Sequence, residues 1–286
     1  MNRVKGSNKS LLRADETAGL GEIQILHPPG VFALTPASHI AVRAIATHQQ
    51  LLHGNGLDWG SGTGCLAIVA AKIKQVEKVI GLEISALDID VARQNAVLNG
   101  VENKTAFFLS DSYHPSAEAD RRSLETMRGQ ISFILANPPS SDGDDGFEYR
   151  RRVLRGARKY LMPGGVVFLN ISYQYGEQRV QDLMQQIPGF SYGGVLVGTD
   201  WVPFDLQRDD LHRCLVFYAT EERRGGLTYS FANPEMPKMT MDAQTALSVF
   251  QQKGLSPLTR WQTHLWVFGN SGGVEASAGT VVRDPA

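Results

Sequence analysis

Residues 57–64 read Leu-Asp-Trp-Gly-Ser-Gly-Thr-Gly, and this run constrains the fold more than any other part of the chain. An apolar stretch ends at Asp58, and three glycines at alternate positions, Gly60, Gly62 and Gly64, follow it. Residues 65–72 are small or apolar up to a lysine and predict a helix buried against a sheet. Glycine is needed where the backbone takes positive φ or lies against a ligand. The run therefore predicts a strand, a tight turn and a helix, with a ligand cleft at the carboxyl end of a parallel strand.

The next three predicted strands each end in polar residues. Residues 79–83 end in Glu83, about twenty residues past the turn, where a carboxylate can accept hydrogen bonds from both hydroxyls of a ribose. Residues 105–109 lead to Asp111 and Ser112, and residues 131–136 lead to an Asn-Pro-Pro-Ser sequence at 137–140. Because parallel strands end at one edge of a sheet, four successive strand ends are expected to converge on one crevice.

These motifs resemble those of the class I S-adenosylmethionine-dependent methyltransferases, over roughly residues 30–220. The chain looks most like the branch that carries an Asn-Pro-Pro-aromatic motif and methylates planar nitrogens, either the glutamine side-chain amide of translation proteins or the exocyclic amines of nucleic-acid bases. Residues 145–151, 160–169 and 175–177 are similar to the glutamine methyltransferases specifically. Residues 30–36 match the loop that closes over the cofactor in this branch.

The resemblance implies an α/β fold, a doubly wound, mostly parallel seven-stranded sheet of the Rossmann-like methyltransferase kind with a C-terminal extension. It also implies S-adenosylmethionine as the cofactor and S-adenosylhomocysteine as its product. Glu83 is the expected adenosine anchor, and Asp111 is expected to receive the adenine amino group. The expected cofactor contacts are Phe32, Thr35, Asp58, Gly60, Ser61, Gly62, Gly64, Glu83, Ile84, Asp111, Ser112 and Asn137.

Asn137, Pro138 and Pro139 are the expected catalytic residues. In the family, the asparagine side-chain oxygen and the first proline carbonyl accept hydrogen bonds from an N–H₂ group and draw its lone pair toward the methyl group, a form of electrostatic preorganisation. The prolines hold these acceptors rigid because their φ is fixed.

Ser140 departs from the family, which has an aromatic ring at this position that stacks on the planar acceptor. Without that ring, a flat acceptor loses a stacking contact, and a small acceptor could occupy the space. The favoured acceptor is an amino-acid-like metabolite, for example a thioether such as methionine or an amine, with Ser140 and Tyr173 as substrate contacts. The alternatives are a glutamine in a translation protein, an RNA or DNA base, and a non-catalytic cofactor-binding subunit. Only about thirty residues precede the catalytic domain, too few for the docking domain of the release-factor enzymes.

The expected organisation is an N-terminal arm at 1–30, a methyltransferase domain at 31–220, a C-terminal extension at 221–270 that serves as substrate lid or dimer contact, and a disordered tail at 271–286. Strands six and seven are predicted at 193–202 and 213–219. Within the extension, residues 227–231 and 264–268 predict strands and residues 242–252 a helix. The extension could instead be an insertion, with the final strand closing the main sheet.

Composition limits the partners. With a net charge of −1, the chain lacks the broad positive potential that attracts nucleic acid. The side chains of Asp142, Asp144 and Asp145 would also repel a polyanion, so nucleic acid is the less favoured partner. In the arginine-rich run at 150–159, Arg151, Arg155 and Arg158 fall on one side of a predicted helix, which is interpreted as a solvated outer face in preference to a phosphate-binding stripe. Arg43, Arg208 and Arg260 are candidates to bind a substrate carboxylate.

The remaining patterns bear on compartment and metal. The two cysteines suit a reducing cytoplasm, and the seven histidines show no metal-ligand spacing, so no metal site is expected. No apolar stretch reaches the roughly twenty residues that span a bilayer, so we expect a cytoplasmic protein without membrane contact. A homodimer is plausible.

Overall fold

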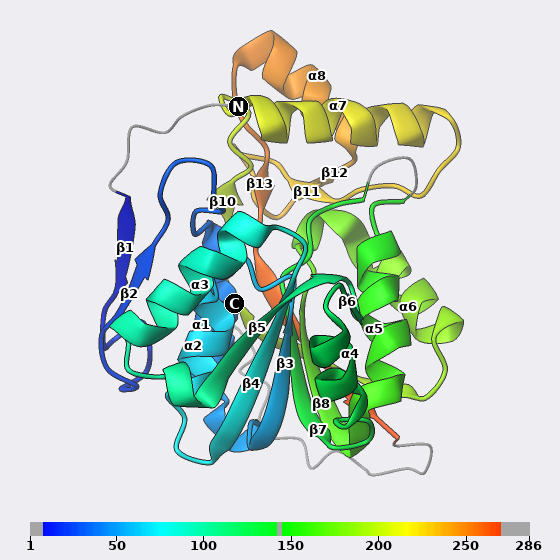
Figure 1. Cartoon of the computed structure of the whole chain (residues 1–286). Helices are drawn as coiled ribbons and strands as arrows, with labels where there is room; N and C mark the ends of the chain where they lie inside the picture. The colour runs from blue at the N-terminus through cyan, green and yellow to red at the C-terminus, as the bar shows by residue number, and fades with distance from the viewer. Residues whose placement is uncertain (1–7, 142–144, 270–286) are drawn as a thin grey trace.

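The computed structural model describes residues 8–141 and 145–269, and a large, mostly parallel sheet lies at its centre (Figure 1). The strand order is β6-β5-β4-β3-β7-β8-β14-β9. Parallel pairing joins β5, β4, β3, β7 and β8 in that order, whereas β14 pairs antiparallel with both β8 and β9. The bounds are β3 Gly54–Trp59, β4 Val76–Glu83, β5 Thr105–Asp111, β6 His114–Pro115, β7 Ile131–Ala136, β8 Leu161–Asn170, β9 Phe190–Gly198 and β14 Gln262–Phe268. The expected doubly wound α/β fold is confirmed, but the sheet has eight strands in the described residues instead of the seven expected, because the short β6 pairs antiparallel with the edge of β5.

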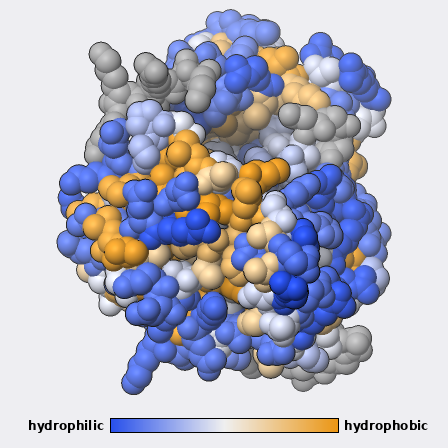
Figure 2. Space-filling model, viewed as in Figure 1, coloured by the Kyte–Doolittle hydropathy of each residue, from blue (hydrophilic) through white to orange (hydrophobic). Residues whose placement is uncertain are grey.

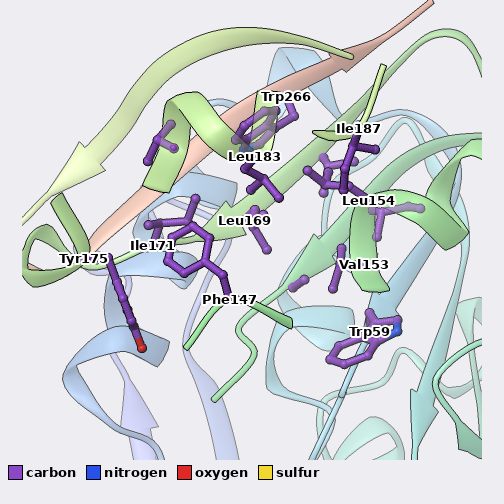
Figure 3. Close-up of a cluster of buried hydrophobic side chains, with 14 of the residues drawn as sticks. Trp59, Phe147, Val153, Leu154, Leu169, Ile171, Tyr175, Leu183, Ile187 and Trp266 are labelled. Carbon is purple, nitrogen blue, oxygen red and sulfur yellow. The ribbon is translucent and has the colours of Figure 1, made fainter. Parts of the chain in front are cut away.

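Helices cover both faces of this sheet (Figure 1). On one face lie α1 Pro36–Thr47, α2 Cys65–Ala71 and α3 Ala86–Leu98, and on the other lie α4 Glu118–Glu125, α5 Glu148–Tyr160 and α6 Gly176–Gln186. Successive residues of β7 feed the two cores in turn, because side chains alternate along a strand: Phe133 packs on the α1–α2 side and Ile134 on the α5–α6 side. Figure 3 shows part of the second core, where Trp59 of β3, Leu169 of β8 and Trp266 of β14 lie among residues of α5 and α6.

The residues at 9–26, in the expected N-terminal arm, form an antiparallel hairpin of β1 Lys9–Leu12 and β2 Ile23–Leu26. The outer edge of β2 is bound by two asparagine side chains of the α3 region. Asn95 accepts from Leu26 N–H at 2.8 Å and donates to the Leu26 carbonyl, and Asn99 does the same for Gln24. The two carboxamides make the hydrogen bonds to β2 that the backbone of a third strand would make, and they satisfy backbone groups that an edge strand would leave unpaired.

The strand predicted at 213–219 is wrong: these residues lie inside α7 Asp209–Arg223. The run Cys-Leu-Val-Phe-Tyr at 214–218 has the composition of a strand, but the buried positions are Leu215, Tyr218, Ala219 and Glu222, a spacing of three and four that only a helix places on one face. Asp209 and Asp210 in the first turn favour the helix further through its dipole. Tertiary burial therefore overrides β-propensity here.

Residues 199–261 form an inserted segment between β9 and β14, so the boundary expected at residue 220 falls within a helix. The other expectation, that the last strand closes the main sheet, is confirmed by the pairing of β14 with β8. The segment lies at the carboxyl ends of the parallel strands, and the surface is hollowed beneath it (Figures 1 and 2). Its elements are β10 Val202–Pro203, α7, β11 Phe231–Ala232, β12 Thr240–Met241, α8 Ala243–Lys253 and β13 Leu258–Thr259, with the strands in the order β10-β13-β11-β12.

Two buried ionic side chains hold this segment together and attach it to the sheet. Glu222 of α7 accepts from the backbone N–H groups of Tyr229, Ala243 and Gln244, and so caps the first turn of α8. Arg179 of α6 donates to the carbonyls of Leu227 and Thr228 and lies 3.9 Å from the ring centroid of Tyr229. Within the residues that the structure describes, no helix is long and apolar enough to cross a bilayer. The tail expected at 271–286 lies outside these residues.

Candidate functional site

The glycine turn after β3 takes the backbone conformation that its sequence demands. Gly60, Gly62 and Gly64 have φ of 69°, 51° and 82°. A Cβ on Gly64 would lie 2.9 Å from the Phe107 ring and 3.0 Å from the Ala92 Cβ, whereas a Cβ on Gly60 would meet nothing within 4 Å. Gly64 is therefore required for packing the turn on the sheet, while Gly60 leaves bare backbone beside open space.

Asp58, at the end of β3, is fully buried behind this turn. Its Oδ2 accepts a hydrogen bond from Ala67 N–H at 2.9 Å, and its Oδ1 has no partner among the described residues. Burial raises the pKa of Asp58 to about 7, an effect that the Ala67 hydrogen bond opposes and the nearby Glu83 charge reinforces. The Ser61 hydroxyl is likewise buried without a partner in the described chain. Two polar atoms beside the turn are thus left unsatisfied.

Glu83, at the end of β4, is nearly buried and oriented by two backbone groups. Its Oε2 accepts from Gly62 N–H at 2.8 Å, and its Oε1 accepts from Ser85 N–H at 2.9 Å. Each carboxylate oxygen retains a further lone pair for a ligand hydroxyl. The side chain of Ile84, the next residue, is 71% exposed, and that of Phe32 is 48% exposed.

The other expected cofactor residues lie at the same edge, and two of them have structural roles. Thr35 accepts from Ser38 N–H and forms the capping box that begins α1. Ser112 has a φ of 55°, and its hydroxyl accepts from Trp59 Nε1 at 2.9 Å. Asp111 is exposed at the end of β5. These placements bring the strand ends together as expected.

Asn137 follows β7 at this edge and is bonded to a residue that the sequence did not single out. The Asn170 Nδ2 group donates to Asn137 Oδ1 at 2.9 Å and to the Ala37 carbonyl at 2.8 Å. Thr263 of β14 donates in turn to Asn170 Oδ1 at 2.6 Å. Buried Asn170, itself held by Ala37 and Thr263, thereby orients the Asn137 carboxamide through one hydrogen bond.

Arg150 holds the loop after Asn137, which corrects its assignment to a solvated face. The side chain is 3% exposed and donates to the carbonyls of Pro138, Pro139, Gly146 and Asn170 at 3.1 to 3.4 Å. Its guanidinium also lies over the rings of Phe147 and Tyr175, with 5.1 and 4.6 Å to the ring centroids. No carboxylate among the described residues forms an ion pair with it. The loop carbonyls thus stabilise a buried cation and are fixed by it.

The rest of the arginine-rich run fits the expectation better. Arg152 and Arg155 pair with Glu148 on the exposed face of α5, and Arg151 pairs with Asp145. The pKa of Asp145 is lowered: burial opposes the shift, but the hydrogen bonds and charge of Arg151 prevail. Asp142 and Asp144 lie outside the described residues.

Ser140 and Tyr173 were the expected substrate contacts. Ser140 is half-buried, and its Oγ would lie 2.9 Å from a Cβ on Gly146. Tyr173, just after β8, packs edge-on against Trp201 of the inserted segment, with 4.8 Å between ring centroids. Ser140 follows Asn137 by three residues, and Tyr173 follows Asn170 by three residues.

The sequence missed Asn170 and misassigned Arg150. A signal existed for Asn170, since this polar residue directly follows the apolar run at 166–169, as Asn137 follows the apolar run at 131–136. For Arg150 the composition of the run pointed to solvent. Only the direction in which α5 faces the loop distinguishes Arg150 from its neighbours.

Comparison with known proteins agrees with this geometry. A family model described as the methyltransferase small domain matches residues 22–189. A release factor glutamine methyltransferase of Thermodesulfovibrio yellowstonii is 25% identical over 177 residues, which is 57% of this chain and 62% of that protein. A protein of Methanocaldococcus jannaschii named as a protein N5-glutamine methyltransferase is 32% identical over 139 residues, 43% of this chain and 64% of its own length. The chain thus spans less than two thirds of the length of these relatives.

Among solved structures, the M. jannaschii tRNA m1G37 methyltransferase has a similar fold. Its TM-score is 0.51 at 12% sequence identity, over 95% of this chain and 60% of that one. At that identity the likeness shows the fold alone. The family model, by contrast, covers more than half of the 286 residues. Together with the glycine turn, Glu83 and the Asn-Pro-Pro loop at one sheet edge, this match shows that the chain belongs to the methyltransferase small domain family.

Proposed function

We propose that this protein is an S-adenosylmethionine-dependent methyltransferase that transfers a methyl group to a planar side-chain nitrogen, the amide of a protein glutamine. The observation that carries the proposal is the Asn137 carboxamide, held at the sheet edge by Asn170, next to a loop that Arg150 fixes. The relatives named as glutamine methyltransferases support the acceptor class.

The residues beside the glycine turn fit the proposed cofactor. Asp58 Oδ1 and Ser61 Oγ are buried polar atoms without a partner in the described chain, and such atoms are costly unless a ligand or water satisfies them. A carboxyl with a pKa near 7 would be drawn to its ionised form by a cationic ligand. Glu83 offers free lone pairs for ribose hydroxyls, and exposed Ile84 and Phe32 offer apolar contacts for a base. Bound S-adenosylmethionine would supply a methyl group that its sulfonium centre already activates.

The chain's own residues would orient the acceptor. A carboxamide oxygen has two lone pairs, and Asn170 uses one of those on Asn137, so one remains for an acceptor N–H. That hydrogen bond would turn the nitrogen lone pair toward the methyl group and lower the barrier through positioning and preorganised charge. The Pro138 carbonyl receives only a 3.4 Å hydrogen bond from Arg150, so it too can accept from the acceptor.

A second candidate is a small amino-acid-like acceptor, such as a thioether or an amine. Ser140 favours it because a hydroxyl replaces the ring that would stack on a flat amide. The relatives' names favour the glutamine acceptor over this candidate.

One experiment separates these acceptors. The purified protein is incubated with methyl-labelled S-adenosylmethionine and a cell extract, and the product is divided by a size filter. Label in retained protein that yields N5-methylglutamine on digestion supports the proposal. Label in the filtrate, after subtraction of free cofactor, supports the small acceptor, and nuclease-sensitive label supports a base. Cofactor binding without any transfer would indicate a non-catalytic subunit.

A further inference from the structure

Three arginines could bind a carboxylate on the acceptor, and their surroundings differ. Arg43 lies on the exposed face of α1. Arg208 donates to Asp210 at 2.6 Å in an exposed ion pair, so an internal carboxylate already occupies it. Arg260 is half-buried where the inserted segment returns to the main sheet. Of these three arginines, only Arg260 is both shielded from water and located where the inserted segment meets the sheet.

The guanidinium of Arg260 is held in place but carries no hydrogen-bonded partner among the described residues. Its Cζ lies 4.2 Å from the ring centroid of Trp201, and Trp201 is in turn packed edge-on by Tyr173. The Nε atom is buried and has no acceptor in the described chain. Stacking on an aromatic face leaves the donors of a guanidinium free in its plane, where a carboxylate binds with two parallel hydrogen bonds.

The backbone of Arg260 is hydrogen-bonded to the chain segment that orients Asn137. Its carbonyl accepts from Tyr173 N–H at 2.9 Å, and Tyr173 lies three residues beyond Asn170, the residue that orients Asn137. Three residues span at most roughly 10 Å. Next to Arg260, Thr199 N–H donates to the Trp261 carbonyl at 3.0 Å, and Trp261 N–H donates to the Thr199 hydroxyl at 3.1 Å. These two hydrogen bonds join the start of the inserted segment to its end.

We infer that Arg260, stacked on Trp201, is a binding site for a carboxylate of the methyl acceptor. The inference rests on the proposed function and adds a specificity element to it. Two sources present the same chemistry: an acidic side chain two or three residues from a target glutamine, or the α-carboxylate of a free amino acid or chain terminus. In either case the planar carboxylate would satisfy the donors that the fold leaves open and place the acceptor nitrogen near Asn137.

Isothermal titration calorimetry in the presence of S-adenosylhomocysteine tests this without turnover. The first probe pair consists of capped alanine–glycine peptides with one central glutamine, with a glutamate or a serine two residues away. The second pair consists of N-acetylglutamine and its methylamide, which differ in the free α-carboxylate. We expect the carboxylate member of at least one pair to bind about tenfold more tightly, the effect of one charged hydrogen-bonded contact. The pair that discriminates identifies the source.

Variants assign the effect to Arg260. Arg260→Gln should abolish the discrimination, Arg260→Lys should retain part of it because the charge remains without the planar fork, and the control Arg208→Gln should retain all of it. Thermal unfolding of each variant reports folding. Equal binding within both pairs, or discrimination that survives Arg260→Gln, overturns the inference.

The labelled-cofactor assay keeps the two proposals apart. If carboxylate binding depends on Arg260 but no label transfers, the site stands and the proposed activity fails. If label transfers to glutamine with no dependence on Arg260, the activity stands and the carboxylate site fails.

Discussion

The two sides of the crevice orient their functional groups by different means. On the side of β3 and β4, Asp58 and Glu83 are held by backbone N–H groups of the turns and helix start that follow these two neighbouring strands, at Ala67, Gly62 and Ser85. On the side of β7 and β8, Asn137 is held by a side chain 33 residues away, which is itself bonded to Thr263, 93 residues further on.

The difference concerns what each side must do. A cofactor of fixed shape can be bound by local turns whose geometry a few glycines determine. An acceptor loop has to be placed relative to that cofactor, so its position depends on contacts between distant elements. Mutations on the first side should therefore reduce cofactor binding directly, whereas mutations on the second side should act by disturbing contacts between distant elements.

Glu83→Ala should have the largest effect and abolish detectable binding of S-adenosylmethionine in calorimetry. It removes the proposed ribose acceptors and frees the Gly62 amide that shapes the turn. Glu77→Ala, at an exposed position of the same strand, is the matched control and should bind normally. Normal affinity in the Glu83 variant would show that the first side does not carry the cofactor.

Asn137→Ala should leave cofactor affinity unchanged and raise the barrier to methyl transfer by roughly 2 to 4 kcal/mol, because its oxygen orients the acceptor. Single-turnover rates with labelled cofactor measure this. Exposed Asn103→Ala serves as the control. Full activity in Asn137→Ala would exclude the nitrogen-acceptor mechanism, whereas a thioether acceptor, which has no hydrogen to donate, would tolerate the change.

Arg150→Lys should destabilise the fold by about 3 kcal/mol, since a lysine cannot reach the carbonyls that the guanidinium satisfies. Urea unfolding gives the free energy. Arg155→Lys, on the exposed face of the same helix, should change it by less than about 0.5 kcal/mol. Equal effects of the two substitutions would mean that the second side does not depend on this cation.

Asp58→Asn should change the pH dependence of stability. The folded pKa of Asp58 is raised to about 7, so its contribution is most favourable below the unfolded value of 3.8 and is lost as pH rises through 7. The wild type should lose roughly 2.5 kcal/mol more than the variant between pH 5 and pH 8, about 1.4 kcal/mol for each pH unit up to the folded pKa. Asp90→Asn, exposed on α3, is the control for urea titrations at the two pH values. Parallel pH profiles for wild type and Asp58→Asn would contradict the raised pKa.

The sequence determined the succession of strand ends from β3 to β7 along the chain, because glycines and strand-end polar residues are local signals. The turn at 60–64 with the helix that follows it, and the helix after Asp242, formed where local patterns predicted them. The same local signals identified Asp58, Glu83 and Asn137, which lie at one edge because parallel strands end together.

Tertiary structure decided the rest. Residues 213–219 have strand composition but became helix because one helical face could be buried against the rest of the inserted segment. Arg150 and Arg155 have the same sequence context, yet one is buried against loop carbonyls and the other faces solvent. The sequence does not distinguish Arg260 from Arg43 and Arg208. In the structure, Arg260 is stacked on Trp201 where the chain returns to the sheet. Local sequence specifies backbone conformation and hence the cofactor side, whereas the direction a side chain faces depends on packing between distant elements, which no local pattern encodes.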